Sequence, residues 1–151
     1  MTINNNEEQG IELEIKIKSQ LQYLSIVRTF LKNISDMKRF SEDVLFEVTL
    51  VLDEAVANII EHGYQLNPDN EVKIKVAVDS EKIFIELTDY SDGFAFESFG
   101  NVDLDAHTKR RKNRGLGVYI IKKIMDDVKY ERGKDQGNRL LMTKYLKKNG
   151  D

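Results

Sequence analysis

The chain has 151 residues, enough for one domain with a buried core. It contains no cysteine, which excludes disulfides and thiolate metal sites, and its net charge of −3 gives the whole molecule no reason to bind nucleic acid or an anionic membrane. No apolar run approaches the roughly 20 residues that span a bilayer. The polar residues 1–10 are unlike a secretory signal. We therefore expect a cytoplasmic protein with a disordered tail over residues 1–10.

Three elements are predicted for the first half of the chain. Alternating apolar and charged residues over 11–18 predict a strand with one buried face. Apolar residues at helical spacing predict a first helix over 21–34 and a longer second helix from about 41 to 62. Gly63 is placed to end the second helix, because glycine readily adopts the left-handed conformation of a helix cap.

A hairpin, a long loop, a third helix and two more strands are predicted for the second half. Alternation over 72–78 and 83–87 predicts an antiparallel hairpin. Residues 90–114 show no periodicity, and a stretch of this length within a domain indicates a functional lid. Strands over 128–132 and 140–146 close the chain. The inner face of the third helix is predicted to hold Val118, Ile121, Ile124, Met125 and Val128.

The order of these elements favours an α+β fold. Strands that pair locally, with helices available to cover one face, are typical of a two-layer α/β sandwich. No repeat or linker divides the chain, so we expect one domain over residues 11–147.

Two polar residues, Glu54 and Asn58, interrupt the apolar pattern of the second helix. They lie four residues apart and so share one helix face. An amide oxygen and a carboxylate are hard ligands suited to magnesium, and a carboxylate can also accept a proton from a hydroxyl. An ordinary polar helix face would show the same spacing. No cluster of metal ligands accompanies them, so a metal is expected to arrive with a bound ligand.

Asp89 stands at the end of a predicted strand and is followed by Ser91, Asp92 and Gly93. A carboxylate at this place can accept a hydrogen bond from the amine of a base, and glycine lets a backbone approach a flat ring. The same residue types are ordinary components of a turn. The residues alone leave both interpretations open.

The segment Gly115-Leu116-Gly117 opens the third predicted helix. Backbone N–H groups at a helix start, with the positive end of the helix dipole behind them, can bind an anion. Five of the six residues over 109–114 are basic and could add positive charge. A flexible loop before a helix is the alternative interpretation, and charge runs are typically solvated.

Taken in order, these segments resemble the GHKL (Bergerat) ATPase superfamily, and within it the anti-sigma-factor serine kinases of the RsbW/SpoIIAB type. Residues 52–64 are similar to the N-box, with its trailing His-Gly-Tyr. Residues 87–94 are similar to the adenine box, and residues 115–118 to the Gly-Leu-Gly box. The resemblance covers residues 11–147 and implies the Bergerat, or histidine-kinase-like ATPase, fold.

The resemblance also implies a role for each matching residue. Asn58 would coordinate Mg²⁺ at the phosphates of ATP, and Glu54 would be the catalytic base that takes the proton of a substrate serine. Asp89 would hydrogen-bond the adenine amine, and Gly93 would lie against the ring. Residues 95–114 would form the ATP lid. The phosphates would be held by the N–H groups of Gly115, Leu116 and Gly117.

The sequence departs from the family pattern at two positions. Ser91 stands where the adenine box usually has its first glycine, and Arg114 stands where a small residue is usual. The family often uses a lid arginine to contact the γ-phosphate, where positive charge suits the transition state of phosphoryl transfer. Arg114 is one candidate for this contact, and the others are Arg110, Arg111 and Lys112.

The family implies a protein serine/threonine kinase that is also an anti-sigma factor. It would phosphorylate an anti-anti-sigma (STAS-domain) partner and hold a sigma factor, as a homodimer without direct contact to nucleic acid or membrane. A second hypothesis is a nucleotide-gated regulator that binds its partner without kinase activity. A sensor histidine kinase fragment is disfavoured, because no separate helix carries a suitable phospho-acceptor histidine.

Overall fold

The computed structural model describes residues 10–92, 114–133 and 135–147. Gly93, most of the expected lid and most of the expected N-terminal tail lie outside the described residues. Within these described ranges, no helix is long and apolar enough to cross a membrane.

In the described part of the chain, five antiparallel strands form one sheet in the order β1-β2-β3-β5-β4. In this order the strands are β1 (Ile11–Lys18), β2 (Glu71–Val78), β3 (Lys82–Asp89), β5 (Asn138–Tyr145) and β4 (Asp127–Glu131). Every second side chain of β2 is buried. The alternation in the sequence therefore places one face of the sheet in the core.

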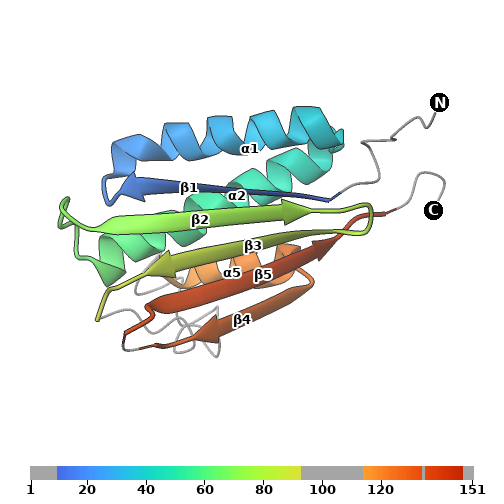
Figure 1. The fold of residues 1–151 in the computed structure, drawn as a ribbon. Helices are drawn as coiled ribbons and strands as arrows, with labels where there is room; N and C mark the ends of the chain where they lie inside the picture. Colours follow the sequence, from blue (N-terminus) through green and yellow to red (C-terminus); the bar gives the residue numbers. More distant parts are fainter. Residues whose placement is uncertain (1–9, 93–113, 134, 148–151) are drawn as a thin grey trace.

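Three α-helices of the described chain form a second layer on that face (Figure 1). They are α1 (Leu24–Lys38), which follows the 3₁₀ turn η1 (Leu21–Tyr23), α2 (Glu42–Asn58) and α5 (Arg114–Ile124). Ser41 caps the start of α2, because its Oγ accepts a hydrogen bond of 3.2 Å from the Val44 N–H. Apolar side chains of both layers fill the space between them. The predicted α+β two-layer sandwich is confirmed.

The second helix ends in a wider, π-helical turn, where the sequence pattern predicts a regular α-helix. The chain stays α-helical to Asn58 and then forms a π-helix, η2 (Ile59–Gly63). The Tyr64 N–H donates to the Ile59 carbonyl, five residues earlier, at 2.8 Å. This spacing is the π pattern, which is rare and is often found at functional sites.

The prediction that Val128 lies on the third helix is wrong. Helix α5 ends at Ile124, and Val128 lies on β4 opposite Met142 of β5. The Asp126 N–H donates to the Thr143 carbonyl at 2.8 Å, so the chain joins the sheet before it reaches Val128. This hydrogen bond to β5 takes the place of the next helical turn, although the apolar spacing of the sequence continues through Val128.

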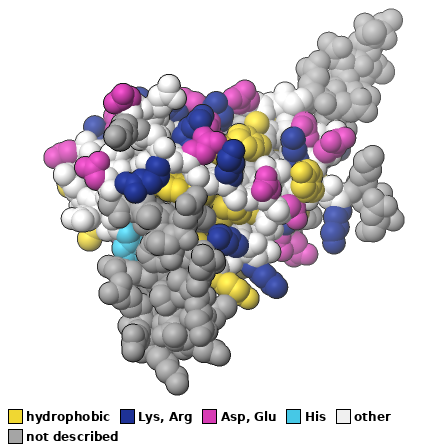
Figure 2. Space-filling model, turned by 90° about the horizontal axis from the view of Figure 1, so that it is seen from below, with side chains coloured by type: hydrophobic (Ala, Val, Ile, Leu, Met, Phe, Trp, Pro, Cys, Tyr) yellow, Lys and Arg dark blue, Asp and Glu magenta, His cyan; other side chains and the backbone are white. Residues whose placement is uncertain are grey.

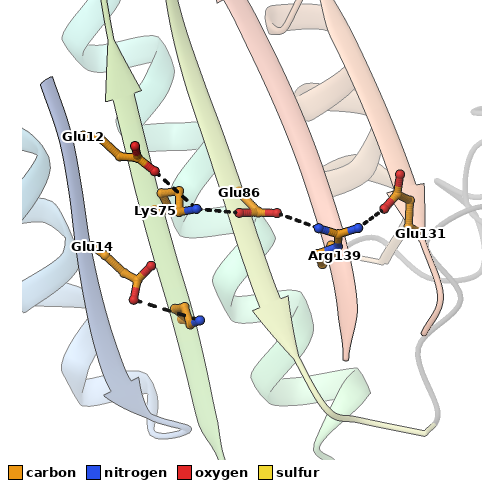
Figure 3. A network of polar contacts seen from close by, with 7 residues as sticks. Glu12, Glu14, Lys75, Glu86, Glu131 and Arg139 are labelled. Carbon is orange, nitrogen blue, oxygen red and sulfur yellow. Dashed lines mark hydrogen bonds and ion pairs between the residues drawn. The ribbon is translucent and has the colours of Figure 1, made fainter. Parts of the chain in front are cut away.

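The outer face of the sheet carries a row of ion pairs across all five strands (Figure 3). Lys75 on β2 lies 3.2 Å from Glu12 of β1 and 3.4 Å from Glu86 of β3. Arg139 on β5 lies 3.4 Å from Glu86 and 2.7 Å from Glu131 of β4. Each exposed pair contributes little alone. Together they favour this register, because opposite charges would not meet in a shifted one.

Charges of both signs are mixed on the face seen from below (Figure 2). Lys and Arg side chains lie among Asp and Glu side chains there, with small apolar areas between them. Among the described residues of this face, the acidic side chains are therefore not gathered into one patch.

Candidate functional site

Three elements converge at one end of the molecule. The carboxyl ends of α2 and β3 and the start of α5 lie at the same end of the two layers (Figure 1). Each carries a segment that the sequence singled out. Glu54 and Asn58 lie on α2, Asp89 ends β3, and Gly117 belongs to the first turn of α5.

Gly117 lies directly against the two polar side chains of α2. A Cβ atom added to Gly117 would lie 2.6 Å from Glu54 Oε2 and 3.2 Å from Asn58 Nδ2. The first of these distances is shorter than any real Cβ contact, so only glycine fits without a shift of Glu54. The fold thus brings together the residues predicted for the base, the metal ligand and the phosphate loop.

Asn58 is a buried polar side chain with one unpaired atom. The residue is only 6% exposed, and its Nδ2 has no hydrogen-bond partner among the described residues. Leaving a buried polar atom unpaired costs roughly 1–3 kcal/mol, so this amide is suited to a bound group. With the amide turned over, Oδ1 takes the unpaired position and offers the hard oxygen that Mg²⁺ prefers. Asn58 therefore fits the predicted metal role.

Glu54 is half-buried, one turn before Asn58. Burial raises the pKa of its carboxyl group, and the nearby carboxylates of Asp53 and Glu61 raise it further. Asp53 in turn accepts a 2.9 Å hydrogen bond from the Arg28 Nε of α1. A raised pKa lets a carboxylate take up a proton more readily, as a general base requires.

Asp89 is 3% exposed and accepts several hydrogen bonds at the end of β3. The Ser91 N–H and the Ser91 hydroxyl donate to Asp89 Oδ1 at 2.9 and 2.6 Å. Asn138 Nδ2 donates to the same oxygen at 3.1 Å. Among the described residues, these hydrogen bonds to the carboxylate all end on Oδ1. The side chain is therefore held in one orientation.

Sequence reasoning missed Asn138, which is 4% exposed and opens β5 directly opposite Asp89. The preceding Gly137 has a φ of 82°. A Cβ added to it would lie 2.8 Å from the Asp89 carbonyl oxygen. Glycine is needed here, because it allows both the left-handed conformation and the close approach of the two strands. The Gly-Asn pair before an apolar strand was the available signal, but the strand register was required to interpret it.

Tyr64, from the His-Gly-Tyr segment, joins three elements. It is 7% exposed and follows η2. Its hydroxyl donates to the Glu71 carbonyl of β2 at 2.7 Å and accepts a 2.8 Å hydrogen bond from the Tyr90 N–H. Burial raises the pKa of the Tyr64 hydroxyl. The end of the second helix is thereby tied to the residue that follows Asp89.

A cavity of about 420 Å³ borders the loop after β3. Its described lining consists of Tyr90, Ser91, Asp92, Arg132, Gly133 and Asn138. Arg132 Nη2 donates to the Asp92 carbonyl at 3.2 Å. Glu54, Asn58 and Asp89 are not part of this lining, so the cavity lies beside the predicted site rather than within it.

The remaining predicted phosphate ligands lie at the start of α5. Arg114 and Gly115 open the helix, and Leu116 follows half-buried in the same turn. N–H groups of a first helical turn have no partner within the helix, and the helix dipole makes this end positive. The described ranges hold no group of three His, Asp or Glu side chains able to bind a metal. In the predicted role, Asn58 would share a metal with the oxygens of a bound ligand.

Comparison with known proteins gives relatives over most of the chain. The histidine kinase-like ATPase domain family matches residues 17–144. Two proteins named Serine-protein kinase RsbW are similar over 145 residues, which are 93% of this chain and 89% of each relative. The protein of Bacillus cereus (strain B4264) is 27% identical, and that of Bacillus mycoides (strain KBAB4) is 26% identical.

A solved structure shares the fold. A chain in the crystal structure of the SiaB-SiaC complex from Pseudomonas aeruginosa matches with a TM-score of 0.61 and 12% sequence identity. The match covers 89% of this chain and 88% of that chain, and at this identity it concerns the fold alone. It confirms the α+β sandwich expected of the Bergerat type. Because the family match spans residues 17–144, this chain belongs to the histidine kinase-like ATPase domain family.

Proposed function

We propose that this chain is an ATP-dependent protein serine kinase and anti-sigma factor. It phosphorylates a serine of an anti-anti-sigma (STAS-domain) partner and sequesters a sigma factor. The observation that carries the proposal is the contact of Gly117 with Glu54 and Asn58, which joins a candidate base to a candidate metal ligand. Similarity to proteins named Serine-protein kinase RsbW supports the reaction class.

The nucleotide is held from two sides of the proposed site. Bound Mg-ATP supplies the phosphoryl group. Asp89 would accept a hydrogen bond from the adenine amine; the predicted role of Gly93 beside the ring falls outside the described residues. Asn58 would hold the magnesium ion through Oδ1, with the amide turned so that this oxygen takes the unpaired position of Nδ2. The phosphates are bound at the positive start of α5 by Arg114, Gly115, Leu116 and Gly117.

Glu54 acts as the general base. It accepts the proton of the acceptor serine hydroxyl, which makes that oxygen a stronger nucleophile. Its raised pKa and its position against Gly117 suit this role. We further propose that the ATPase domain spans residues 11–147 and works as a cytoplasmic homodimer without direct contact to nucleic acid.

Asp89→Asn tests the nucleotide site. The substitution removes the charged acceptor for the adenine amine, and a hydrogen bond to a charged group is worth about 1.5–3 kcal/mol, or roughly 10- to 100-fold in affinity. Calorimetric titration with Mg-ATP should show this loss. The exposed Asp69→Asn variant should bind like the wild type. Equal affinity of Asp89→Asn and wild type would show that Asp89 does not contact the base.

Glu54→Gln tests the reaction. Loss of general-base catalysis should slow phosphoryl transfer to a STAS-domain partner by about 10²- to 10⁴-fold while the affinity for Mg-ATP stays the same. Transfer is followed with radiolabelled ATP, and binding by calorimetry. The Glu81→Gln variant, in the exposed turn between β2 and β3, is the control. If the wild type captures the partner in a nucleotide-dependent manner but never phosphorylates it, the nucleotide-gated regulator is the correct function.

Gly117→Ala tests the contact between α5 and α2. The added Cβ would lie 2.6 Å from Glu54 Oε2 and should displace that flexible carboxylate. A misplacement near 1 Å can slow a reaction by about 10²-fold, so transfer should fall by this factor while the thermal midpoint changes little. In the control Gly10→Ala, the added Cβ lies 3.4 Å from the Val78 carbonyl oxygen, an ordinary contact. Unchanged transfer in Gly117→Ala would contradict the assigned role of Glu54.

The raised pKa of Glu54 predicts a pH-dependent effect of Glu54→Gln on stability. Because the folded-state pKa lies above its ordinary value of 4.5, the folded protein binds this proton more tightly than the unfolded chain does. The charged carboxylate therefore destabilises the folded state as the pH rises above 4.5, and does so fully above the folded-state pKa of Glu54. Calorimetry should give the variant a higher thermal midpoint than the wild type at pH 7. The difference should shrink towards pH 4, and a constant difference would contradict the assignment.

A further inference from the structure

We propose that Ser91 and Asn138 together set the selectivity of the nucleotide site for the base. We call these two residues the Ser91–Asn138 clamp. They act on Asp89 and so favour a purine with a 6-amino group over one with a 6-oxo group. The proposal rests on the proposed function, in which Asp89 meets the base. It makes Ser91 and Asn138 positioning residues.

The clamp saturates one oxygen of Asp89. Oδ1 accepts hydrogen bonds from the Ser91 N–H at 2.9 Å, the Ser91 hydroxyl at 2.6 Å and Asn138 Nδ2 at 3.1 Å. Three donors on one oxygen fix the rotation of the carboxylate plane. Oδ2 accepts none of these hydrogen bonds, so it is left as the acceptor for the ligand of the proposed site.

The orientation of the Asn138 amide follows from its two partners. Nδ2 donates to Asp89 Oδ1 and also to the Ser91 carbonyl, at 2.8 Å, so both of its hydrogens are used. Turned over, the amide would place its oxygen against two acceptor oxygens, which is repulsive. Asn138 is buried, and the close approach of Gly137 to the Asp89 carbonyl keeps it opposite Asp89.

A fixed acceptor distinguishes the two kinds of purine. The exocyclic amine of adenine donates a hydrogen bond to Oδ2, whereas a 6-oxo group would set two acceptors against each other. A carboxylate free to rotate could turn Oδ2 away and admit the oxo group, so loss of the clamp reduces selectivity as well as affinity. Ser91, which departs from the adenine-box pattern, therefore strengthens base recognition in this chain.

The test compares Mg-ATP with Mg-ITP, in which an oxo group replaces the 6-amino group. Dissociation constants are measured by calorimetry for the full chain and for Ser91→Gly, Asn138→Ala and Ser91→Thr. Ser91→Gly and Asn138→Ala should each lower the preference for ATP over ITP by about tenfold, the effect expected for one hydrogen bond to a charged group. Ser91→Thr keeps a hydroxyl and should keep the preference. Ser80→Gly, in an exposed turn, should behave like the wild type.

The outcomes separate the clamp from the site itself. A wild type that binds ATP, with variants that lose affinity for ATP and ITP equally, would overturn the clamp and leave the proposed function standing. Equal loss accompanied by a lower thermal midpoint would have the same meaning, because it shows a purely structural role. A wild type that binds neither nucleotide would overturn the proposed function and the clamp with it.

Discussion

The packing of α5 on α2 at Gly117 is the contact on which the proposed site depends. With no side chain between the helices, the first turn of α5 reaches Glu54 and Asn58 directly. The other end of α5 is held by the sheet, because the Asp126 N–H bonds to the Thr143 carbonyl one residue before β4. A helix fixed at both ends can present its N–H groups to a phosphate without ordering further backbone, which lowers the entropic cost of binding.

The second half of the site depends on the register of two strands. Because β3 pairs with β5 in antiparallel register, Asp89 at the end of one strand meets Asn138 at the start of the other. The Tyr64 hydroxyl accepts a hydrogen bond from the N–H of Tyr90, the residue that follows Asp89. The helical layer is therefore also connected to the corner of the sheet formed by Asp89 and Asn138. The corner is built from buried polar groups that satisfy one another. Such networks are rigid when complete, and this one supports a single geometry for the carboxylate.

Much of the fold was predictable, because strand alternation and helical spacing are local properties of the sequence. The alternation over 72–78 and 83–87 located β2 and β3, and the position of Glu54 and Asn58 on one helix face followed from their spacing. Val128 was misplaced because its spacing from α5 also suits a helix, and only the hydrogen bonds to β5 decide against one.

The partners of the predicted residues were less accessible to sequence reasoning. The contact of Gly117 with α2 depends on how two helices cross, and Asn138 depends on a strand register, and neither is encoded in a local pattern. Gly93 and the basic residues before Arg114 lie outside the described residues, so their roles stay predictions.

The π-helix η2 (Ile59–Gly63) makes chain length, as well as composition, a constraint on the position of Tyr64. Its wide turn holds one residue more than an α-helical turn would. Wound as a regular α-helix, at about 100° per residue, the same five residues would turn further about the helix axis. Tyr64 would then point away from both the Glu71 carbonyl and the Tyr90 N–H. Relatives that keep this arrangement should therefore keep the number of residues in η2 as well as the apolar character of the buried Ile59 and Ile60.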